Sequence, residues 1–162
     1  MPMRRLNLFS LMALCATLAA CSHAPSREQI GAACTTLAGR SIPAASIGLP
    51  SGPATVHSAV LVTAAPGSVS GNSLMPATPE YCKVLGTVAS RDPKAQPINF
   101  QLNLPTRWNG KALQYGGGGF NGVPISGLAP LRDAAPGDPL PIARGYATFG
   151  TDSGHQASAF PA

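Results

Sequence analysis

Four consecutive glycines, Gly116–Gly119, directly follow a short apolar stretch at 111–115. Glycine loses more conformational entropy on folding than any other residue, so a run of four needs a structural reason. Such runs let a backbone come close to a bound group and direct its N–H groups toward it. Backbone donors arranged in this way form the oxyanion holes of enzymes that transfer acyl groups. The run therefore predicts an oxyanion hole, with a flexible turn as the alternative; a phosphate loop would need a Lys-Ser or Lys-Thr pair after the glycines, and none follows.

An oxyanion hole serves a nucleophile, and no Gly-x-Ser-x-Gly elbow occurs in the 162 residues. Asp152, Ser153 and His155 have the residue types of a catalytic triad. A triad needs side chains that converge from separate segments, with the serine on a strained turn, and one tetrapeptide does not meet this requirement. We therefore expect 152–155 to form a strand-end loop at the rim of the site, in which Asp152 or His155 orients neighbouring loops.

Strands must position these residues, and the hydrophobic pattern indicates where they lie. Strand patterns occur at 56–65, 81–89, 98–104, 111–115 and 145–151. The regular alternation at 98–104 is typical of a half-buried strand. We predict antiparallel pairing of 81–89 with 98–104, and parallel pairing of the last two strands across a crossover. This order is that of an α/β fold with a mixed sheet and early antiparallel strands, as at the start of an α/β-hydrolase sheet.

Helical patterns are weaker than strand patterns in this chain. Residues 27–37 are expected to form a helix, with Ser26 as its cap. A second helix is expected at 128–135. The stretch 66–79 is expected to be a turn-rich loop, and 136–141 to be irregular.

The N-terminus has the features of an export signal. Arg4 and Arg5 precede an apolar stretch at 6–20, and Leu18–Cys21 reads as a lipobox. The apolar stretch is short for a membrane-spanning helix. We therefore predict a lipoprotein signal peptide at 1–21, with an ordinary signal peptide that happens to contain Cys21 as the alternative.

Lipidation of Cys21 would anchor the protein to a membrane without a spanning helix. Residues 22–33 would then be a tether. Ser22 after the lipobox favours the outer membrane, so the expected location is a bacterial outer membrane or periplasm. The remainder, 34–162, is expected to be the N-terminal part of a catalytic domain that ends before its nucleophile.

Two cysteines remain once Cys15 is assigned to the signal and Cys21 to the lipid. Cys34 and Cys82 are expected to form a disulfide, because the envelope is oxidising. Two free buried thiols are the alternative. Metal binding is not expected, since neither cysteine has a further Cys or His at ligand spacing.

The charge of the chain excludes one class of partner. The formal net charge is +5, but charged residues make up only 10% of the chain. The basic residues are scattered and not interleaved with aromatic residues, so nucleic-acid binding is not expected. The 18 glycines and 17 prolines separate clear strand patterns, which indicates a loop-rich globular segment.

Several of these elements together resemble a known family. They are Tyr81–Gly86, Phe100–Pro105, Trp108–Lys111, Gly116–Phe120, Gly145–Ala147 and Thr151–His155. In order and spacing they resemble the tannase and feruloyl esterase family.

The resemblance implies an exported serine esterase with an α/β-hydrolase core, a lid domain and aromatic-acid esters as substrates. It implies that Gly118 or Gly119 supplies a backbone N–H to the oxyanion hole, and that Cys34 and Cys82 are the N-terminal disulfide pair. The family's catalytic Ser, Asp and His, its lid and its calcium site have no counterpart here. We therefore expect no cofactor in this segment and no activity from it alone.

A non-catalytic function is the alternative interpretation. In it, the chain is a lipid-anchored envelope binding protein that retains half of the fold. The expected partners are a small aromatic ester and, through the lipid, a membrane; the sequence does not indicate an oligomeric state.

Overall fold

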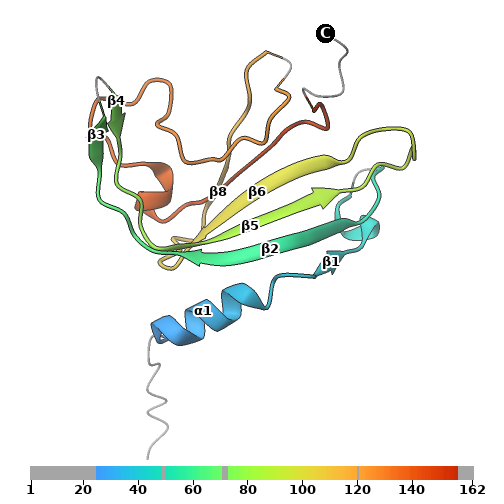
Figure 1. Cartoon of the computed structure of the whole chain (residues 1–162), viewed down its shortest axis with the longest axis horizontal. Helices are drawn as coiled ribbons and strands as arrows, with labels where there is room; N and C mark the ends of the chain where they lie inside the picture. Colours follow the sequence, from blue (N-terminus) through green and yellow to red (C-terminus); the bar gives the residue numbers. More distant parts are fainter. Residues whose placement is uncertain (1–24, 49, 71–72, 120, 157–162) are drawn as a thin grey trace, which may run out of the picture.

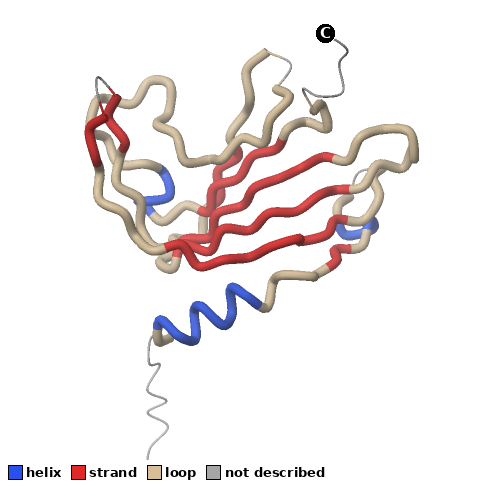
Figure 2. Tube along the Cα trace, in the orientation of Figure 1, coloured by secondary structure: helices blue, strands red, loops and turns tan. Residues whose placement is uncertain are grey.

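The computed structural model describes residues 25–48, 50–70, 73–119 and 121–156. A six-stranded sheet runs through this part of the chain in the order β1-β2-β5-β6-β8-β7 (Figures 1 and 2). Its strands are β1 (Ser41–Ile42), β2 (Ala54–Val62), β5 (Tyr81–Val88), β6 (Ile98–Pro105), β7 (Ala112–Gln114) and β8 (Ala147–Thr151). All neighbouring pairs are antiparallel except β7 and β8. The expected mixed sheet is thus confirmed.

The strand pairing agrees with the alternation in the sequence. In β5 and β6, Tyr81 lies opposite Pro105 and Val88 lies opposite Ile98, as expected for an antiparallel pair. Strand β8 is inserted between β6 and β7 and pairs with β7 in parallel, with Ala112 opposite Ala147. The predicted crossover is therefore confirmed.

Helix α1 (Arg27–Thr35) lies against one face of the sheet (Figure 1). It begins at a capping box, in which Gln29 N–H donates to Ser26 Oγ and Ser26 N–H donates to Gln29 Oε1. Residues 27–33 of the stretch expected to be a tether lie in this helix.

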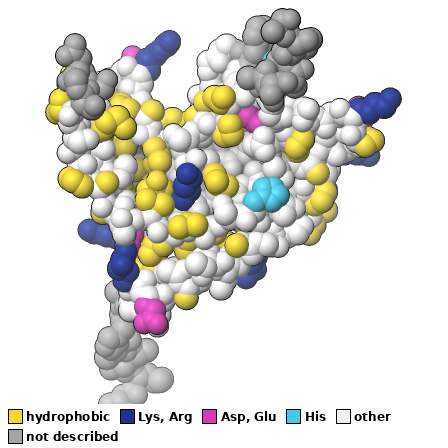
Figure 3. Space-filling model, viewed as in Figure 1, with side chains coloured by type: hydrophobic (Ala, Val, Ile, Leu, Met, Phe, Trp, Pro, Cys, Tyr) yellow, Lys and Arg dark blue, Asp and Glu magenta, His cyan; other side chains and the backbone are white. Residues whose placement is uncertain are grey.

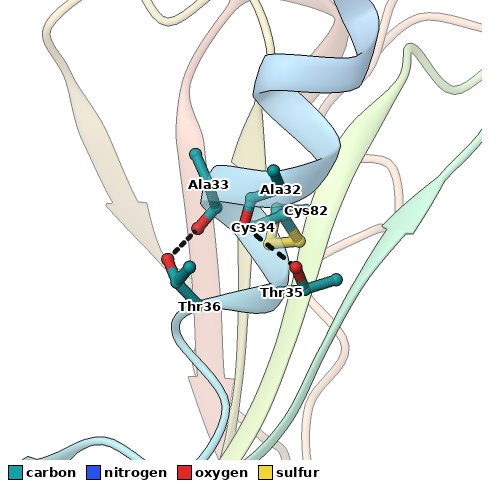
Figure 4. The surroundings of a disulfide bond; sticks show 6 residues. All are labelled: Ala32, Ala33, Cys34, Thr35, Thr36 and Cys82. Atoms are coloured by element: carbon teal, nitrogen blue, oxygen red, sulfur yellow. Dashed lines mark hydrogen bonds between the residues drawn. A yellow bond between two sulfur atoms is a disulfide. The ribbon is translucent and has the colours of Figure 1, made fainter.

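A disulfide joins this helix to the sheet. Cys34 lies near the end of α1 and is bonded to Cys82 in β5, with the two Cα atoms 5.7 Å apart (Figure 4). Both cysteines are buried in an apolar cluster. The other buried members of that cluster are Val56, Ala59 and Val84, and Leu37, Leu61, Phe100, Leu102 and Leu104 pack against it.

Loss of this disulfide should destabilise the sheet. The bonded cysteines are 48 residues apart, so the bond stabilises by about 4 kcal/mol in the chain-entropy account. In the full-length protein we expect Cys34→Ser/Cys82→Ser to lower the unfolding midpoint measured in denaturant. A reductant should lower the midpoint of the wild type and leave that of the double variant unchanged; equal responses would contradict the expectation.

The face of β6 that contains Gln101 and Asn103 was expected to be exposed to solvent, but another segment of the chain covers it. Gln101 and Asn103 are 7% and 0% exposed, so the prediction of a half-buried strand is wrong for this face. Gln101 Nε2 donates to Ser126 O at 3.2 Å, and Asn103 Nδ2 donates to the same oxygen at 2.7 Å. The amide side chains thus hold the segment between β7 and β8 against the sheet, on the side away from α1 (Figure 1).

Two further expectations for loops are corrected. Residues 128–135 form no helix, because Pro130 has no N–H to donate and disfavours a helical conformation in the residue before it. The stretch 66–79, expected to be a loop, contains a hairpin of β3 (Ser68–Ser70) and β4 (Ser73–Met75). Two 3₁₀ helices, η1 (Ala44–Ser46) and η2 (Pro141–Arg144), complete the elements.

Candidate active site

The glycine run lies at an edge of the sheet where several segments meet. It follows the carboxyl end of β7, and the parallel strand β8 ends at the same edge, followed by 152–156. Strand β6 is antiparallel to β8, so its first residues, Ile98 and Asn99, lie there too. Ligands of open α/β sheets bind beyond the carboxyl ends of parallel strands. This edge is therefore the candidate site.

The start of the glycine run is anchored to the fold. Tyr115 N–H donates to Phe149 O at 2.7 Å and extends the pairing of β7 with β8. The Tyr115 hydroxyl donates to Ala129 O at 3.0 Å. Burial raises the pKa of Tyr115, which keeps this hydroxyl protonated.

Gly118 and Gly119 present backbone donors at this edge. Both are exposed, and within the described ranges no hydrogen bond uses the N–H of either residue. Gly119 has a φ of 57°, in the left-handed region where a glycine is favoured. Exposed N–H groups on a backbone at the strand end are the kind of donors that an oxyanion hole requires.

Asn121 ties the glycine run to the end of β8. Its N–H donates to Gly118 O at 3.1 Å, and its Nδ2 donates to Thr151 O at 2.7 Å and to Ser153 Oγ at 3.0 Å. Asn121 and Ser153 both have a φ of 60°. Sequence reasoning missed Asn121, although Asn is one of the few residues that adopt this conformation readily.

The run is packed closely at one glycine. A Cβ on Gly117 would lie 1.9 Å from Asn121 Oδ1 and 2.3 Å from its Cγ, so no other residue fits without moving the Asn121 side chain. At Gly116 and Gly118 a Cβ would meet nothing within 4 Å. The four glycines therefore have different roles.

Asp152 joins the β8 end to β6. It is fully buried and accepts hydrogen bonds from Asn99 N, Asn99 Nδ2, Gly154 N and Gln156 Nε2, at 3.0, 2.5, 2.9 and 2.7 Å. Burial alone would raise the pKa of Asp152, but the hydrogen bonds from Gln156, Asn99 and Gly154 outweigh it, and the pKa is lowered. The carboxylate thus orients the loop at 152–156, as the sequence suggested.

The tetrapeptide 152–155 is arranged as a turn. The Asp152 carboxylate is engaged by Asn99, Gly154 and Gln156, and the Ser153 hydroxyl accepts from Asn121. The His155 N–H donates to Asp152 O at 3.1 Å. These contacts are those of a strand-end loop.

The part of the chain that the structure describes contains no group of three or more His, Cys, Asp or Glu residues that could hold a metal ion. None of its helices is long and apolar enough to cross a membrane. On the face shown in Figure 3, the Lys and Arg side chains form no continuous patch. Cys21 and the signal at 1–21 lie outside the described residues.

Known proteins match this chain across most of its length. An uncharacterized esterase of Agrobacterium fabrum is 45% identical over 129 residues, which are 76% of this chain and 21% of that protein. The mono(2-hydroxyethyl) terephthalate hydrolase of Piscinibacter sakaiensis is 35% identical over 95 residues, 57% of this chain and 15% of that protein. An uncharacterized esterase of Xanthomonas campestris pv. campestris is 32% identical over 154 residues, 94% of this chain and 23% of that protein.

The chain spans about a fifth of the length of these curated relatives. The family model described as tannase and feruloyl esterase matches residues 82–162, which begin at the disulfide in β5, include the glycine run and continue past the end of β8. The disulfide is typical of exported proteins. With the parallel β7–β8 pair and the glycine run at its carboxyl edge, these findings place the chain in the tannase and feruloyl esterase family of α/β-hydrolases.

Proposed function

We propose that the protein containing this chain hydrolyses carboxylic esters of aromatic acids through a serine acyl-enzyme. The observation that carries the proposal is the position of Gly118 and Gly119, two exposed residues beyond the carboxyl end of β7 whose N–H groups make no hydrogen bond within the described part of the chain. Two matched relatives are named esterases, and the third is named for an ester of terephthalate, an aromatic acid.

In this mechanism a serine attacks the ester carbonyl carbon while a histidine accepts the serine proton. Negative charge develops on the carbonyl oxygen, and the N–H groups of Gly118 and Gly119 stabilise it. Collapse of the tetrahedral intermediate breaks the ester C–O bond, and the histidine gives its proton to the leaving oxygen, which departs as the alcohol. Water, deprotonated by the same histidine, then hydrolyses the acyl-enzyme and releases the acid and the serine. The chain covers 15–23% of its relatives' length, so we place the Ser, Asp and His outside residues 1–162 and expect no hydrolysis from this segment alone.

The test is ester hydrolysis by the full-length protein together with labelling by a fluorophosphonate. We expect faster hydrolysis of methyl hydroxycinnamates and gallates than of aliphatic methyl esters, and one labelled serine in a peptide other than the one that contains Ser153. A protein that neither hydrolyses these esters nor takes the label would contradict the proposal and favour the envelope binding protein. Label on Ser153 would contradict our placement of the nucleophile.

We also propose that Cys21 is lipidated and anchors the protein to the outer membrane. The support is the lipobox at Leu18–Cys21 together with the Cys34–Cys82 disulfide that follows it, since disulfides are typical of exported proteins. In bacteria fed an alkyne fatty acid, we expect the protein to incorporate the label and to sediment with membranes. Cys21→Ala should lose both properties, whereas Cys15→Ala should keep both; a labelled Cys21→Ala protein would show that the prediction is wrong.

A further inference from the structure

An oxyanion hole works only if its donors are held in place before the reaction. Donors that must reorganise as charge develops lose most of their electrostatic advantage. A run of four glycines is the most flexible backbone available, so it does not hold itself. Something outside Gly116–Gly119 must therefore fix the positions of the Gly118 and Gly119 N–H groups.

The contacts of Asn121 meet this requirement. The Asn121 N–H holds the Gly118 carbonyl, which belongs to the peptide unit whose N–H is that of Gly119. The Asn121 Nδ2 holds Thr151 O at 2.7 Å and Ser153 Oγ at 3.0 Å. One residue thus connects the proposed donor to the end of β8, which pairs with both β6 and β7.

The other end of this connection is anchored to β6. Residue 152 follows Thr151 directly, and the buried Asp152 carboxylate is bonded to the Asn99 N–H in β6 at 3.0 Å. The Asn121 Oδ1 is buried against Gly117 and has no hydrogen-bond partner among the described residues. Burial of an amide oxygen without a hydrogen bond costs free energy. The two hydrogen bonds that Nδ2 donates must therefore offset this cost and hold the side chain in place.

We propose that Asn121 is the positioning residue for the oxyanion-binding N–H groups of Gly118 and Gly119. The inference rests on the proposed esterase function. Asn121 acts through the glycine run and touches no reacting atom. It fixes the direction of the Gly119 N–H through the Gly118 carbonyl, and it fixes the distance of the run from the β8 end through its side chain.

The decisive variant is Asn121→Asp in the full-length protein. It keeps the size of the side chain and a residue that tolerates a φ of 60°, but it sets a carboxylate oxygen against the Thr151 carbonyl. We expect kcat to fall at least about tenfold, since small displacements of a catalytic group carry costs of this order, while KM stays within about threefold.

The matched control is Asn109→Asp, at the other end of β7. Asn109 also joins the β7 region to the β8 region: its Nδ2 donates to Arg144 O at 2.8 Å, and its Oδ1 accepts from Lys111 N at 2.9 Å. If Asn121 had only a structural role, Asn121→Asp and Asn109→Asp should lower kcat equally. We expect Asn109→Asp to lower the melting temperature and to leave kcat within about threefold of wild type.

A transition-state analogue separates positioning from stability. An arylboronic acid forms a tetrahedral adduct with the serine, and we expect its inhibition constant to rise in Asn121→Asp by the same factor by which kcat falls. A folded Asn121→Asp protein with unchanged kcat, or an Asn109→Asp protein with an equal loss of kcat, would overturn the inference alone. A wild-type protein without esterase activity would overturn the proposed function and the inference with it.

Discussion

Gly117→Ala in the full-length protein should reduce kcat by about a hundredfold or more, the range found when an oxyanion-hole donor is lost. A Cβ at this position would lie 1.9 Å from Asn121 Oδ1 and 3.0 Å from Asn121 Cβ. The Asn121 side chain must rotate away to relieve the contact with Oδ1, and this rotation breaks its hydrogen bonds to Thr151 and Ser153; Asn121 Cβ must also shift by a few tenths of an ångström.

The neighbouring glycine provides the control. Gly116→Ala introduces the same methyl group one residue earlier, where it meets nothing within 4 Å and where φ is not in the left-handed region. We expect its kcat to stay within a few-fold of wild type, and steady-state kinetics on one aryl ester measures both variants. Equal losses in the two variants would show that the run needs flexibility everywhere, which would contradict distinct roles for its glycines.

Asp152→Ala should destabilise the site edge by about 3 kcal/mol, because it leaves the donors of Asn99, Gly154 and Gln156 without their acceptor. Hydrogen exchange is the measurement: the Asn99 and Gly154 amides should lose protection in the full-length variant. Asp138→Ala is the control, since among the described residues the Asp138 carboxylate accepts a hydrogen bond from Ala135 N alone, at 3.0 Å. Unchanged protection at Asn99 would contradict the role assigned to Asp152.

The same carboxylate gives the edge a pH dependence. The pKa of Asp152 in the folded protein is below its ordinary value, so the ionised carboxylate is stabilised by the folded state relative to the unfolded one. Asp152 therefore stabilises the fold at pH values above the ordinary aspartate pKa of about 3.9, and this contribution is lost as pH falls through the folded-state pKa. In the wild type, hydrogen-exchange protection of the Asn99 amide should therefore decrease in acid. In Asp152→Asn, which has no carboxylate to protonate, this decrease should be absent.

The sequence predicts the strands of the sheet better than it predicts the segments that pack on the sheet. Alternation identified β5 and β6 and their antiparallel pairing, because each strand packs one apolar face against α1 and its disulfide. The same alternation could not show that Gln101 and Asn103 are buried, since an amide side chain is polar whether it meets water or the Ser126 carbonyl. The expected helix at 128–135 was wrong because Pro130 outweighs the apolar spacing around it.

For the candidate site, the sequence located the glycine run but not its support. Four glycines are a visible signal, and the structure places them at a strand end with N–H groups uncommitted among the described residues. The contacts of Asn121 with Thr151 and Ser153 span 30 and 32 residues of sequence, so they arise only from the parallel pairing of β7 with β8. An Asn soon after a glycine run was the available clue.

The most direct test of the account is a structure of the full-length protein with an arylboronate bound to its serine. The quantity to measure is the distance from the adduct's oxygen to the backbone nitrogens of Gly118 and Gly119. We expect one or both distances to be about 2.7–3.1 Å, the range for an oxyanion-hole donor, with Asn121 still bonded to Thr151. An oxygen that binds other donors, with both glycine nitrogens beyond about 4 Å, would contradict the assignment of the oxyanion hole to this run.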